Sequence, residues 1–274
     1  MEKRFITLKN GMNIFVLQKG LKNLAPLILL HGWPSNTFLW RNILPGLSKS
    51  FSVYAPDLPG YGRSDKPLDV DYDMAFYHEF LLEFYDALGL KKASLVAHDL
   101  GAIAGLSLAV RNPQKIEKLV IMNTGPYSNW PLTVRLLLNI LSARPLTSLF
   151  LNRLVYTILL KTSVYNTRCM TPEVVDLFRN HWMDTTNGKA AFSRTIKAPP
   201  SRMAEPVEKL RAIDIETMIL WGKEDRFFPF SLARKLHGDI KGSKLVGIEK
   251  AGHFIQEDNP EYVQEKIMDF LIEK

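Results

Sequence analysis

The sequence predicts an α/β fold in which a mostly parallel central sheet carries an inserted helical lid. Three observations support this prediction. Short, almost wholly apolar runs recur along the chain, as expected of strands that are buried on both faces. Segments with helical spacing separate these runs, and such alternation is typical of a parallel sheet. The alternation stops after Tyr127 and resumes after residue 202, so we expect a core of residues 1–127 and 203–274 and a lid of residues 128–202.

Each core element is predicted by a local pattern. Residues 4–8 and 12–17 alternate between polar and apolar and flank Asn10-Gly11, a dipeptide that favours a hairpin turn. The apolar run at 26–31 predicts a buried strand, and four later segments share its character: SVYAPD, ASLVAHD, EKLVIMN and ETMILWG. The remaining expected elements are helices near 38–49, 73–88, 101–111, 229–238 and 260–272, and a strand at 244–248.

The lid sequence indicates helices and no convincing strand. Its first half is rich in Leu with Arg at intervals, which is the pattern of amphipathic helices. Pro145 is expected to divide two of them, because proline interrupts a helix. Thr171-Pro172 is a helix start, and Pro199-Pro200 ends the segment.

Composition narrows the class of protein. Apolar residues make up 46% of the 274 residues and charged residues 23%, which is ordinary for a globular protein with a real core. The single cysteine allows no internal disulfide, so a reducing, cytoplasmic setting is expected. The first residues lack a basic cap followed by an apolar run, so no signal peptide is expected. No apolar stretch reaches the ~18 residues of a membrane span.

The positive charge is confined to one part of the chain. The net charge is +7, and residues 128–202 hold ten of the 35 Lys and Arg but only three of the 28 Asp and Glu, so the rest is balanced. One interpretation is a solvated basic face. The other is a field that gathers anionic substrates or anionic surfaces. Nucleic acid is disfavoured, because no Lys/Arg run is interleaved with aromatic residues.

The central motif is Ala97-His98-Asp99-Leu100-Gly101, between an apolar strand and a predicted helix. A strand, a sharp turn and a helix form a nucleophile elbow, whose middle side chain is usually serine. Here that position holds Asp99, whose carboxylate is ionised near neutral pH without the help of a base. It can displace a leaving group from saturated carbon and form an ester, which water must then hydrolyse.

A base for that second step is predicted at His253, in the loop after the last strand. Asp225 lies just past another strand and is expected to hold one imidazole nitrogen so that the other faces water. The backbone N–H groups of Trp33 and Leu100 are expected to form an oxyanion hole for the charge that develops on the ester. The neighbouring His31 and His98 are expected to be satisfied by local hydrogen bonds.

Together these motifs resemble the haloalkane dehalogenase and epoxide hydrolase branch of the α/β-hydrolase superfamily. The resemblance covers most of residues 26–127 and 206–272 and rests on HGWPSNTFLWRN, DLPGYGRSDKP, AHDLGA, WGKEDRFFP and AGHFIQEDNP. It implies an α/β-hydrolase fold with Asp99 as nucleophile, Asp225 as the acid and His253 as the base, in the chain order of that superfamily. The alternative acid position of some dehalogenases holds Asn123 here, which supports Asp225.

The sequence departs from the branch at several points. Dehalogenases and epoxide hydrolases commonly carry Trp directly after the nucleophile, and here that residue is Leu100. Dehalogenases commonly carry Asn or Glu after the His-Gly pair, and here Trp33 could present its indole N–H to a halide. Epoxide hydrolases add two lid tyrosines that protonate the epoxide oxygen. The candidates for contacts with substrate or leaving group are Tyr127, Tyr156 and Tyr165, with Phe192 where the second tyrosine commonly stands.

The first functional hypothesis is therefore cleavage of carbon–halogen bonds through an Asp99 ester, and the second is epoxide hydrolysis. A third is a catalytically weak homologue that binds a ligand, and a fourth is an esterase whose elbow serine was replaced by Asp99. The expected partner is a small molecule, possibly anionic in view of the basic lid. No cofactor or metal is implied, because neither a metal-ligand cluster nor a phosphate-binding Gly loop follows an early strand. The sequence leaves monomer and homodimer open.

Overall fold

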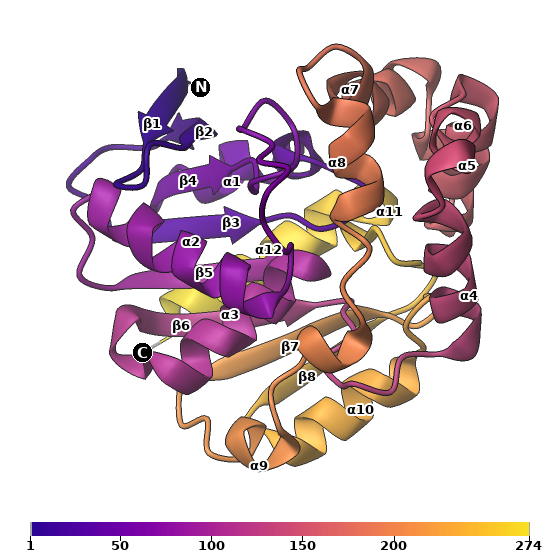
Figure 1. Cartoon of the computed structure of the whole chain (residues 1–274). Helices are drawn as coiled ribbons and strands as arrows, with labels where there is room; N and C mark the ends of the chain where they lie inside the picture. The colour runs from indigo at the N-terminus through magenta and orange to yellow at the C-terminus, as the bar shows by residue number, and fades with distance from the viewer. Residues whose placement is uncertain (1, 274) are drawn as a thin grey trace.

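A central sheet of eight strands organises the molecule (Figure 1). The computed structural model describes residues 2–273, with side chains at all but residues 144 and 145. The strand order is β1-β2-β4-β3-β5-β6-β7-β8. The six strands from β3 to β8 run parallel, whereas β2 is antiparallel to both β1 and β4, so the prediction of a mostly parallel sheet is confirmed. The strands are β1 Glu2–Thr7, β2 Asn13–Lys19, β3 Pro26–Leu30, β4 Ser52–Pro56, β5 Ala93–His98, β6 Ile116–Met122, β7 Thr217–Gly222 and β8 Lys244–Ile248.

The predicted N-terminal hairpin is present. Strands β1 and β2 pair from Glu2 opposite Gln18 to Thr7 opposite Asn13. The connection between them contains the Asn10-Gly11 dipeptide, and the Asn10 side chain accepts a hydrogen bond from the N–H of Met12 at 3.0 Å. A short polar side chain that bonds its own turn is the reason why asparagine is favoured there.

The core strands bury both faces, because successive residues point into two different clusters. Leu95 and Ala97 of β5 belong to the cluster that includes α2, α3 and α10, whereas Val96 belongs to the cluster that includes α1 and α12. Figure 1 shows α2 and α3 in front of the sheet and α12 behind it. The core helices are α1 Leu44–Leu47, α2 Met74–Ala87, α3 Leu100–Arg111, α9 Val207–Leu210, α10 Phe230–Asp239, α11 Ile255–Asp258 and α12 Pro260–Ile272.

The prediction of one helix near 38–49 is wrong. A 3₁₀ turn at Thr37–Trp40 and the single turn of α1 at Leu44–Leu47 replace it. Pro45 lies in the first turn of α1, and because it has no N–H to donate, a helix cannot run through it from the preceding residues. The other predicted core helices are present within one residue at each end.

The segment between β6 and β7 is helical, as predicted, and no strand lies within its described residues. Helix α5 begins next to Pro145, and α7 begins at Pro172, where the Thr171 hydroxyl accepts a hydrogen bond from the N–H of Val174. We use the word lid for residues 128–202, the boundaries expected from the sequence; its helices lie along the right-hand side and top of Figure 1. They are α4 Leu132–Leu141, α5 Arg144–Phe150, α6 Arg153–Thr162, α7 Pro172–Met183 and α8 Gly188–Arg194.

Candidate active site

Asp99 occupies a sharp turn between β5 and α3. Its backbone has φ 51° and ψ −115°, in the left-handed range that L-residues rarely adopt, which is typical of a nucleophile elbow. Two hydrogen bonds hold the strained backbone: the Asp99 N–H donates to the carbonyl of Met122 at 3.1 Å, and the Thr124 hydroxyl donates to the Asp99 carbonyl at 2.7 Å. The carboxylate is thereby turned out above the end of the sheet.

Two glycines make room for this turn. A Cβ at Gly101 would lie 2.6 Å from the carbonyl oxygen of His31, and a Cβ at Gly32 would overlap the Asp99 side chain. The His-Gly pair after β3 and the elbow after β5 can therefore approach each other only without side chains at these positions.

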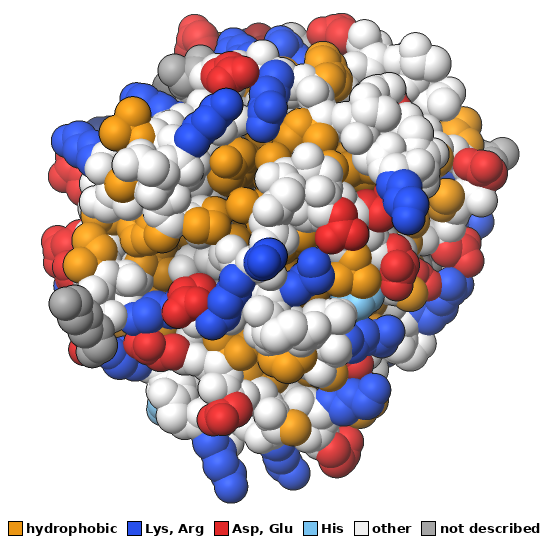
Figure 2. All heavy atoms as spheres, turned by 90° about the vertical axis from the view of Figure 1, so that its left-hand side faces the viewer, with side chains coloured by type: hydrophobic (Ala, Val, Ile, Leu, Met, Phe, Trp, Pro, Cys, Tyr) orange, Lys and Arg blue, Asp and Glu red, His pale blue; other side chains and the backbone are white. Residues whose placement is uncertain are grey.

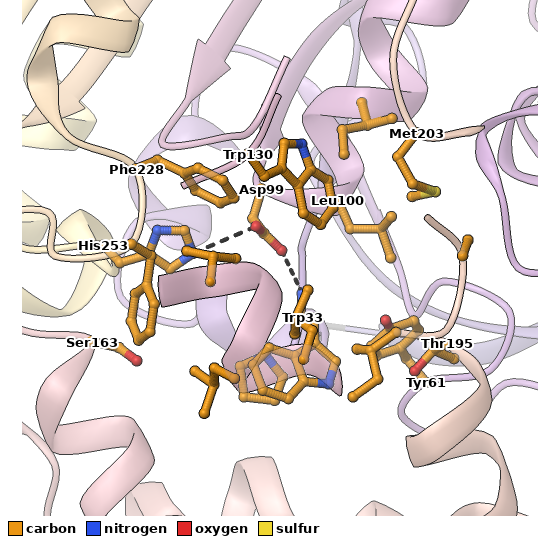
Figure 3. Close-up of a pocket in the computed structure, with 18 residues that line it drawn as sticks. Trp33, Tyr61, Asp99, Leu100, Trp130, Ser163, Thr195, Met203, Phe228 and His253 are labelled. Atoms are coloured by element: carbon orange, nitrogen blue, oxygen red, sulfur yellow. Dashed lines mark hydrogen bonds and ion pairs between the residues drawn. The ribbon is translucent and has the colours of Figure 1, made fainter. Parts of the chain in front are cut away.

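The structure brings Asp99, Asp225 and His253 together at the carboxyl ends of β5, β7 and β8, where the ends of parallel strands meet at one edge of the sheet. His253 Nδ1 lies 2.9 Å from Asp225 Oδ2, and its Nε2 lies 3.6 Å from Asp99 Oδ2. Figure 3 shows the His253 ring directed at the Asp99 carboxylate. Asp225 thus fixes the imidazole so that Nε2 faces the Asp99 carboxylate.

Asp225 is held by more than the histidine. Its Oδ1 accepts hydrogen bonds from the N–H groups of Phe227 at 2.8 Å and Phe228 at 3.0 Å. Its Oδ2 also accepts one from the Asn123 amide at 2.8 Å. The sequence indicated only that Asn123 is not the acid; the structure shows that its amide fixes the orientation of the acid.

The two predicted oxyanion-hole donors meet Asp99 itself. The N–H of Trp33 donates to Asp99 Oδ1 at 2.8 Å, and the N–H of Leu100 also lowers the pKa of this carboxylate. One carboxylate oxygen is therefore held by a backbone amide, while the other faces His253. This division matches what an ester of Asp99 would need, with its carbonyl oxygen in the hole and its other oxygen bonded to substrate carbon.

Burial and charge set the protonation of this pair. Burial raises the pKa of Asp99, although the nearby His253 and the amides of Leu100 and Trp33 offset part of the rise. Burial alone would lower the pKa of His253, but the carboxylates of Asp225 and Asp99 outweigh it and leave that pKa above its ordinary value. The imidazole is therefore tuned by two neighbouring acids.

A cavity between the core and the lid opens onto this pair (Figure 3), and its wall is almost wholly apolar. Apart from Asp99 and His253, no charged side chain lies among the described residues that line it. One buried donor in its wall, the Trp33 indole Nε1, has no hydrogen-bond partner in the described part of the chain, whereas the Tyr61 hydroxyl lies beside the hydroxyls of Thr195 and Tyr77. Figure 3 places Trp33 and Tyr61 along one side of the cavity, with Thr195 nearby.

The four residues expected to contact substrate or leaving group lie outside this cavity lining. The Tyr127 hydroxyl donates to Asp239 at 2.8 Å, and the Tyr156 hydroxyl contacts the carbonyls of Pro34 at 2.5 Å and Phe178 at 3.0 Å. Tyr165 is exposed, and the ring of Phe192 packs against that of Trp33 with centroids 5.9 Å apart. The expected contacts with substrate are therefore corrected: two tyrosines are occupied by other partners, one faces solvent, and Phe192 packs behind Trp33.

The two flanking histidines are buried core residues. His31 Nε2 accepts a hydrogen bond from the N–H of Leu58 at 3.0 Å, and burial lowers the pKa of His31 to about 4, so it is neutral. His98 Nε2 lies 2.9 Å from the carbonyl of His253 and supports the catalytic loop, while its Nδ1 has no partner among the described residues. The expectation of local hydrogen bonds thus holds fully for His31 and at one nitrogen for His98.

The lid supports the base as well as covering it. The carbonyl of Ser163, just after α6, accepts hydrogen bonds from the N–H groups of His253 at 2.8 Å and Phe254 at 3.0 Å. Sequence patterns give no signal for this contact, because a backbone carbonyl is present at every residue. In residues 2–273, no group of three His, Cys, Asp or Glu side chains is arranged to hold a metal ion.

Comparison with known proteins places this geometry in a family. Residues 25–260 match the sequence model of the family described as alpha/beta hydrolase fold. The chain is 27% identical to an uncharacterised hydrolase, YugF, of Bacillus subtilis, over 96% of this chain and 95% of that protein. It is 27% identical to a 2-hydroxymuconate semialdehyde hydrolase of a Pseudomonas species, over 90% of this chain and 87% of that protein.

The solved structures agree on the fold. A meta-cleavage product hydrolase, CumD, superposes with a TM-score of 0.85 at 22% identity, covering 99% of this chain and 98% of that one. These relatives are not named as dehalogenases or epoxide hydrolases, so the resemblance to that branch is corrected to the broader family, and the branch is left to proposal. With its match over most of the sequence, its parallel sheet and its elbow, the chain belongs to the α/β-hydrolase family.

Proposed function

We propose that this protein is a hydrolase in which Asp99 attacks saturated carbon, and that it cleaves carbon–halogen bonds. One observation carries the proposal: Asp99 Oδ1 is held by the Trp33 amide while Oδ2 is turned toward His253 and the cavity. A serine at this position would need His253 to remove its proton, whereas a carboxylate leaves the histidine available for water.

In the first step, Oδ2 of Asp99 forms a bond to the substrate carbon as the carbon–halogen bond breaks. The halide leaves with the bonding electron pair, and no proton is transferred. The product is an alkyl ester of Asp99, which is neutral. Loss of the negative charge beside His253 removes one of the two acids that raise its pKa, so the imidazole becomes a neutral base when the next step requires one.

In the second step, His253 Nε2 takes a proton from a water molecule, which attacks Cγ of the ester. Negative charge develops on Oδ1, where the Trp33 amide already donates, and the Leu100 amide follows directly after Asp99 in the chain. The bond between Cγ and Oδ2 then breaks, the alcohol leaves with Oδ2, and His253 returns the proton to it. Asp99 emerges as a carboxylic acid with one oxygen that came from water, and loss of its proton to solvent restores the carboxylate.

The unpartnered Trp33 indole N–H suggests where the halide is held. A buried N–H or O–H without a partner is rare in proteins and calls for an explanation. Trp33 and Tyr61 lie in the same wall of an otherwise apolar cavity, and an anion leaving from carbon would accept a hydrogen bond from the unpartnered Trp33 Nε1. Since no Lys or Arg lies among the described residues of this wall, the proposed substrates are neutral and apolar rather than anionic.

Epoxide hydrolysis is the second candidate, and Tyr61 favours it. Burial raises the pKa of Tyr61 above its ordinary value, so its hydroxyl keeps its proton and could donate it to an opening epoxide. The lid tyrosines expected for this role are engaged elsewhere or exposed. A single tyrosine from the core would therefore have to serve alone.

The relatives suggest a third candidate, hydrolysis of an acid such as 2-hydroxymuconate semialdehyde. The carboxylate of such a substrate would need a positively charged partner once it is buried. No such partner lies among the described residues that line the cavity, and Asp99 adds a negative charge at its end. The electrostatics therefore disfavour this reaction here.

The deciding experiment blocks the second step. A His253→Gln variant should form the ester but not hydrolyse it, so incubation with 1-bromobutane should release one bromide per protein and leave a butyl group on the Asp99 peptide in mass spectrometry. The matched control is the Asp99→Ala/His253→Gln double variant, which should release none. Wild-type protein in H₂¹⁸O should incorporate ¹⁸O into Asp99 as it turns over.

Each of the other possible results would support a different function. An adduct from 1,2-epoxybutane but none from 1-bromobutane would establish the epoxide hydrolase. Turnover of a substrate panel without any adduct or ¹⁸O on Asp99 would refute the carboxylate nucleophile. Tight reversible binding without turnover would identify a ligand-binding homologue.

A further inference from the structure

The lid exposes most of the large apolar side chains on the surface of the molecule. Across residues 2–273, thirteen large hydrophobic side chains are exposed, and ten of them lie between residues 132 and 183. Three consecutive helices, α4, α5 and α6, carry seven of these: Leu132, Leu136, Ile140, Leu146, Leu149, Leu154 and Ile158. In Figure 1 these helices line the right-hand edge of the molecule. Grouped apolar exposure of this kind usually marks an interaction site.

Helix α4 shows that this exposure is not a by-product of covering the cavity. Its inner face lines the cavity with Val134, Leu137 and Leu138. Its outer face presents Leu132, Leu136 and Ile140, which are 64%, 53% and 51% exposed and follow one another at intervals of four residues. Residues at that spacing form one stripe along a helix. The helix is therefore apolar on two sides, and the cavity accounts for only one of them.

The same helices are basic and free of acids. From Ser128 to Pro172 the sequence has no Asp or Glu. Arg135 on α4 and Lys161 on α6 are exposed beside the leucines. The opposite face of the molecule differs, because acidic and basic side chains lie side by side there (Figure 2). The partner of the lid should therefore combine an apolar interior with negative charge.

We propose that helices α4, α5 and α6 form a docking surface for an anionic lipid bilayer. The exposed leucines and isoleucines would enter the boundary between headgroups and acyl chains, while Arg135 and Lys161 would meet the negative headgroups. No helix among the described residues is long and apolar enough to cross a membrane, so the contact is peripheral. Because α4 also lines the cavity, docking would place the cavity wall next to the bilayer, in which apolar substrates concentrate.

A second copy of the chain is a less suitable partner for this surface than a bilayer. In a two-fold symmetric dimer, each surface meets its own copy. Arg135 and Lys161 would then face the same cations of the partner, and the segment from Ser128 to Pro172 offers no acid to pair with them. A bilayer with anionic headgroups supplies that charge, which decides between the two.

Co-sedimentation of the full chain with lipid vesicles tests the proposal. The protein should bind vesicles of equal parts phosphatidylcholine and phosphatidylglycerol, bind phosphatidylcholine alone much more weakly, and dissociate as salt is added. The Leu132→Ser/Leu136→Ser/Ile140→Ser variant should lose at least about tenfold in affinity. The Arg135→Gln/Lys161→Gln variant should lose about thirtyfold, and only toward the anionic vesicles.

The matched control removes three exposed apolar side chains outside the lid: Phe5→Ser/Leu21→Ser/Ile272→Ser. It should bind as the wild type does. Thermal unfolding followed by circular dichroism shows whether each variant is folded, and if the triple lid variant is not, the Arg135→Gln/Lys161→Gln variant decides alone. Failure of the wild type to bind anionic vesicles, or equal binding by the lid variants, would overturn the proposal. So would a dimer without lipid that the triple lid variant converts to a monomer. None of these readouts depends on the chemistry of Asp99.

Discussion

The two halves of the site are built in different ways. On the core side, the polar groups hold one another: Asp225 accepts bonds from His253, Asn123 and two backbone amides, and the Trp33 amide holds one oxygen of Asp99. On the lid side, α4 supplies apolar side chains only, and the hydrogen bonds to the catalytic loop come from one backbone carbonyl, that of Ser163. The core fixes what reaction can occur, and the lid fixes which molecules reach it.

This division has a physical basis. Strands β5 and β7 have neighbours on both sides and β8 pairs with β7, so hydrogen bonds within the sheet fix the ends of the strands from which these side chains follow. Catalysis requires such fixed positions, because a misplacement of about 1 Å can cost about 10²-fold in rate. Apolar contacts are not directional, so the lid can change its residues while it still excludes water. The predictions below separate the two halves, beginning with the largest effect.

Removal of the nucleophile should have the largest effect. Asp99→Ala should lower kcat for bromide release by at least about 10⁴-fold, because no ester can form. The variant should still fold. Burial raises the pKa of Asp99, which means that the ionised side chain does not stabilise the folded state. Steady-state bromide release and the Tm from thermal unfolding measure the two effects. If the variant kept its turnover, the core would not hold the nucleophile that we assign to it.

The pH dependence should show a loss on the acid side only. His253 must be neutral to accept a proton from water, so kcat should fall about tenfold for each pH unit below its pKa in the ester state. Asp99 must be ionised to attack, so kcat/KM should also fall in acid as the Asp99 carboxylate becomes protonated. No group has to be protonated before the reaction begins, so kcat should reach a plateau at alkaline pH. A fall in rate at alkaline pH would contradict this scheme, because it would show that a step requires a proton donor.

The raised pKa of His253 also predicts a trend in stability. A group whose pKa is higher in the folded state than its ordinary 6.5 stabilises the fold most below that ordinary value. Its contribution is lost as the pH rises through the higher, folded-state pKa. Asp225→Asn removes the larger of the two raising charges, so the Tm of this variant should depend less on pH across that range than the Tm of the wild type.

The local motifs explain how much could be predicted from the sequence. Asp99, Asp225 and His253 each follow a buried strand, so the order of strands in a parallel sheet is sufficient to bring them to one edge. The elbow and the oxyanion amides are equally local, because they depend on the backbone next to Gly32 and Gly101. The prediction of the N-terminal hairpin succeeded for the same reason.

The predictions that failed depend on contacts between distant residues. The Tyr127 hydroxyl is bound to Asp239, which lies 112 residues away, and the Tyr156 hydroxyl to Pro34, 122 residues away. Helical periodicity in the lid shows which side chains share a face but not which face meets the cavity. Tyr61 lies in the DLPGYGRSDKP segment, which the sequence offered only as a family motif, and the lid packs over it through Trp182.

An exchange of acid and amide tests the core in a finer way. Asn123 Nδ2 lies 2.8 Å from Asp225 Oδ2, so a carboxylate at position 123 would be within reach of the same imidazole edge. Asp225→Asn alone should lower kcat by about 10²–10³-fold, because the imidazole loses its orienting charge. The Asn123→Asp/Asp225→Asn variant should regain about tenfold of this loss. Equal rates in the single and double variants would show that the orientation, and not the charge, of this edge is required.

The smallest effect should come from the lid, and it should change selectivity rather than rate. Leu137 on α4 lines the cavity, whereas its neighbour Leu136 points outward and is 53% exposed. Leu137→Phe narrows the cavity, so kcat/KM for 1-bromohexane should fall roughly tenfold relative to bromoethane, since one or two methylene groups no longer fit. Leu136→Phe adds the same bulk on the outer face and should leave that ratio unchanged. Both variants make the same substitution on one helix. If the ratio of the two kcat/KM values changed in both, α4 would have to shift as a rigid body. The lid would then control the chemistry as well as the choice of substrate.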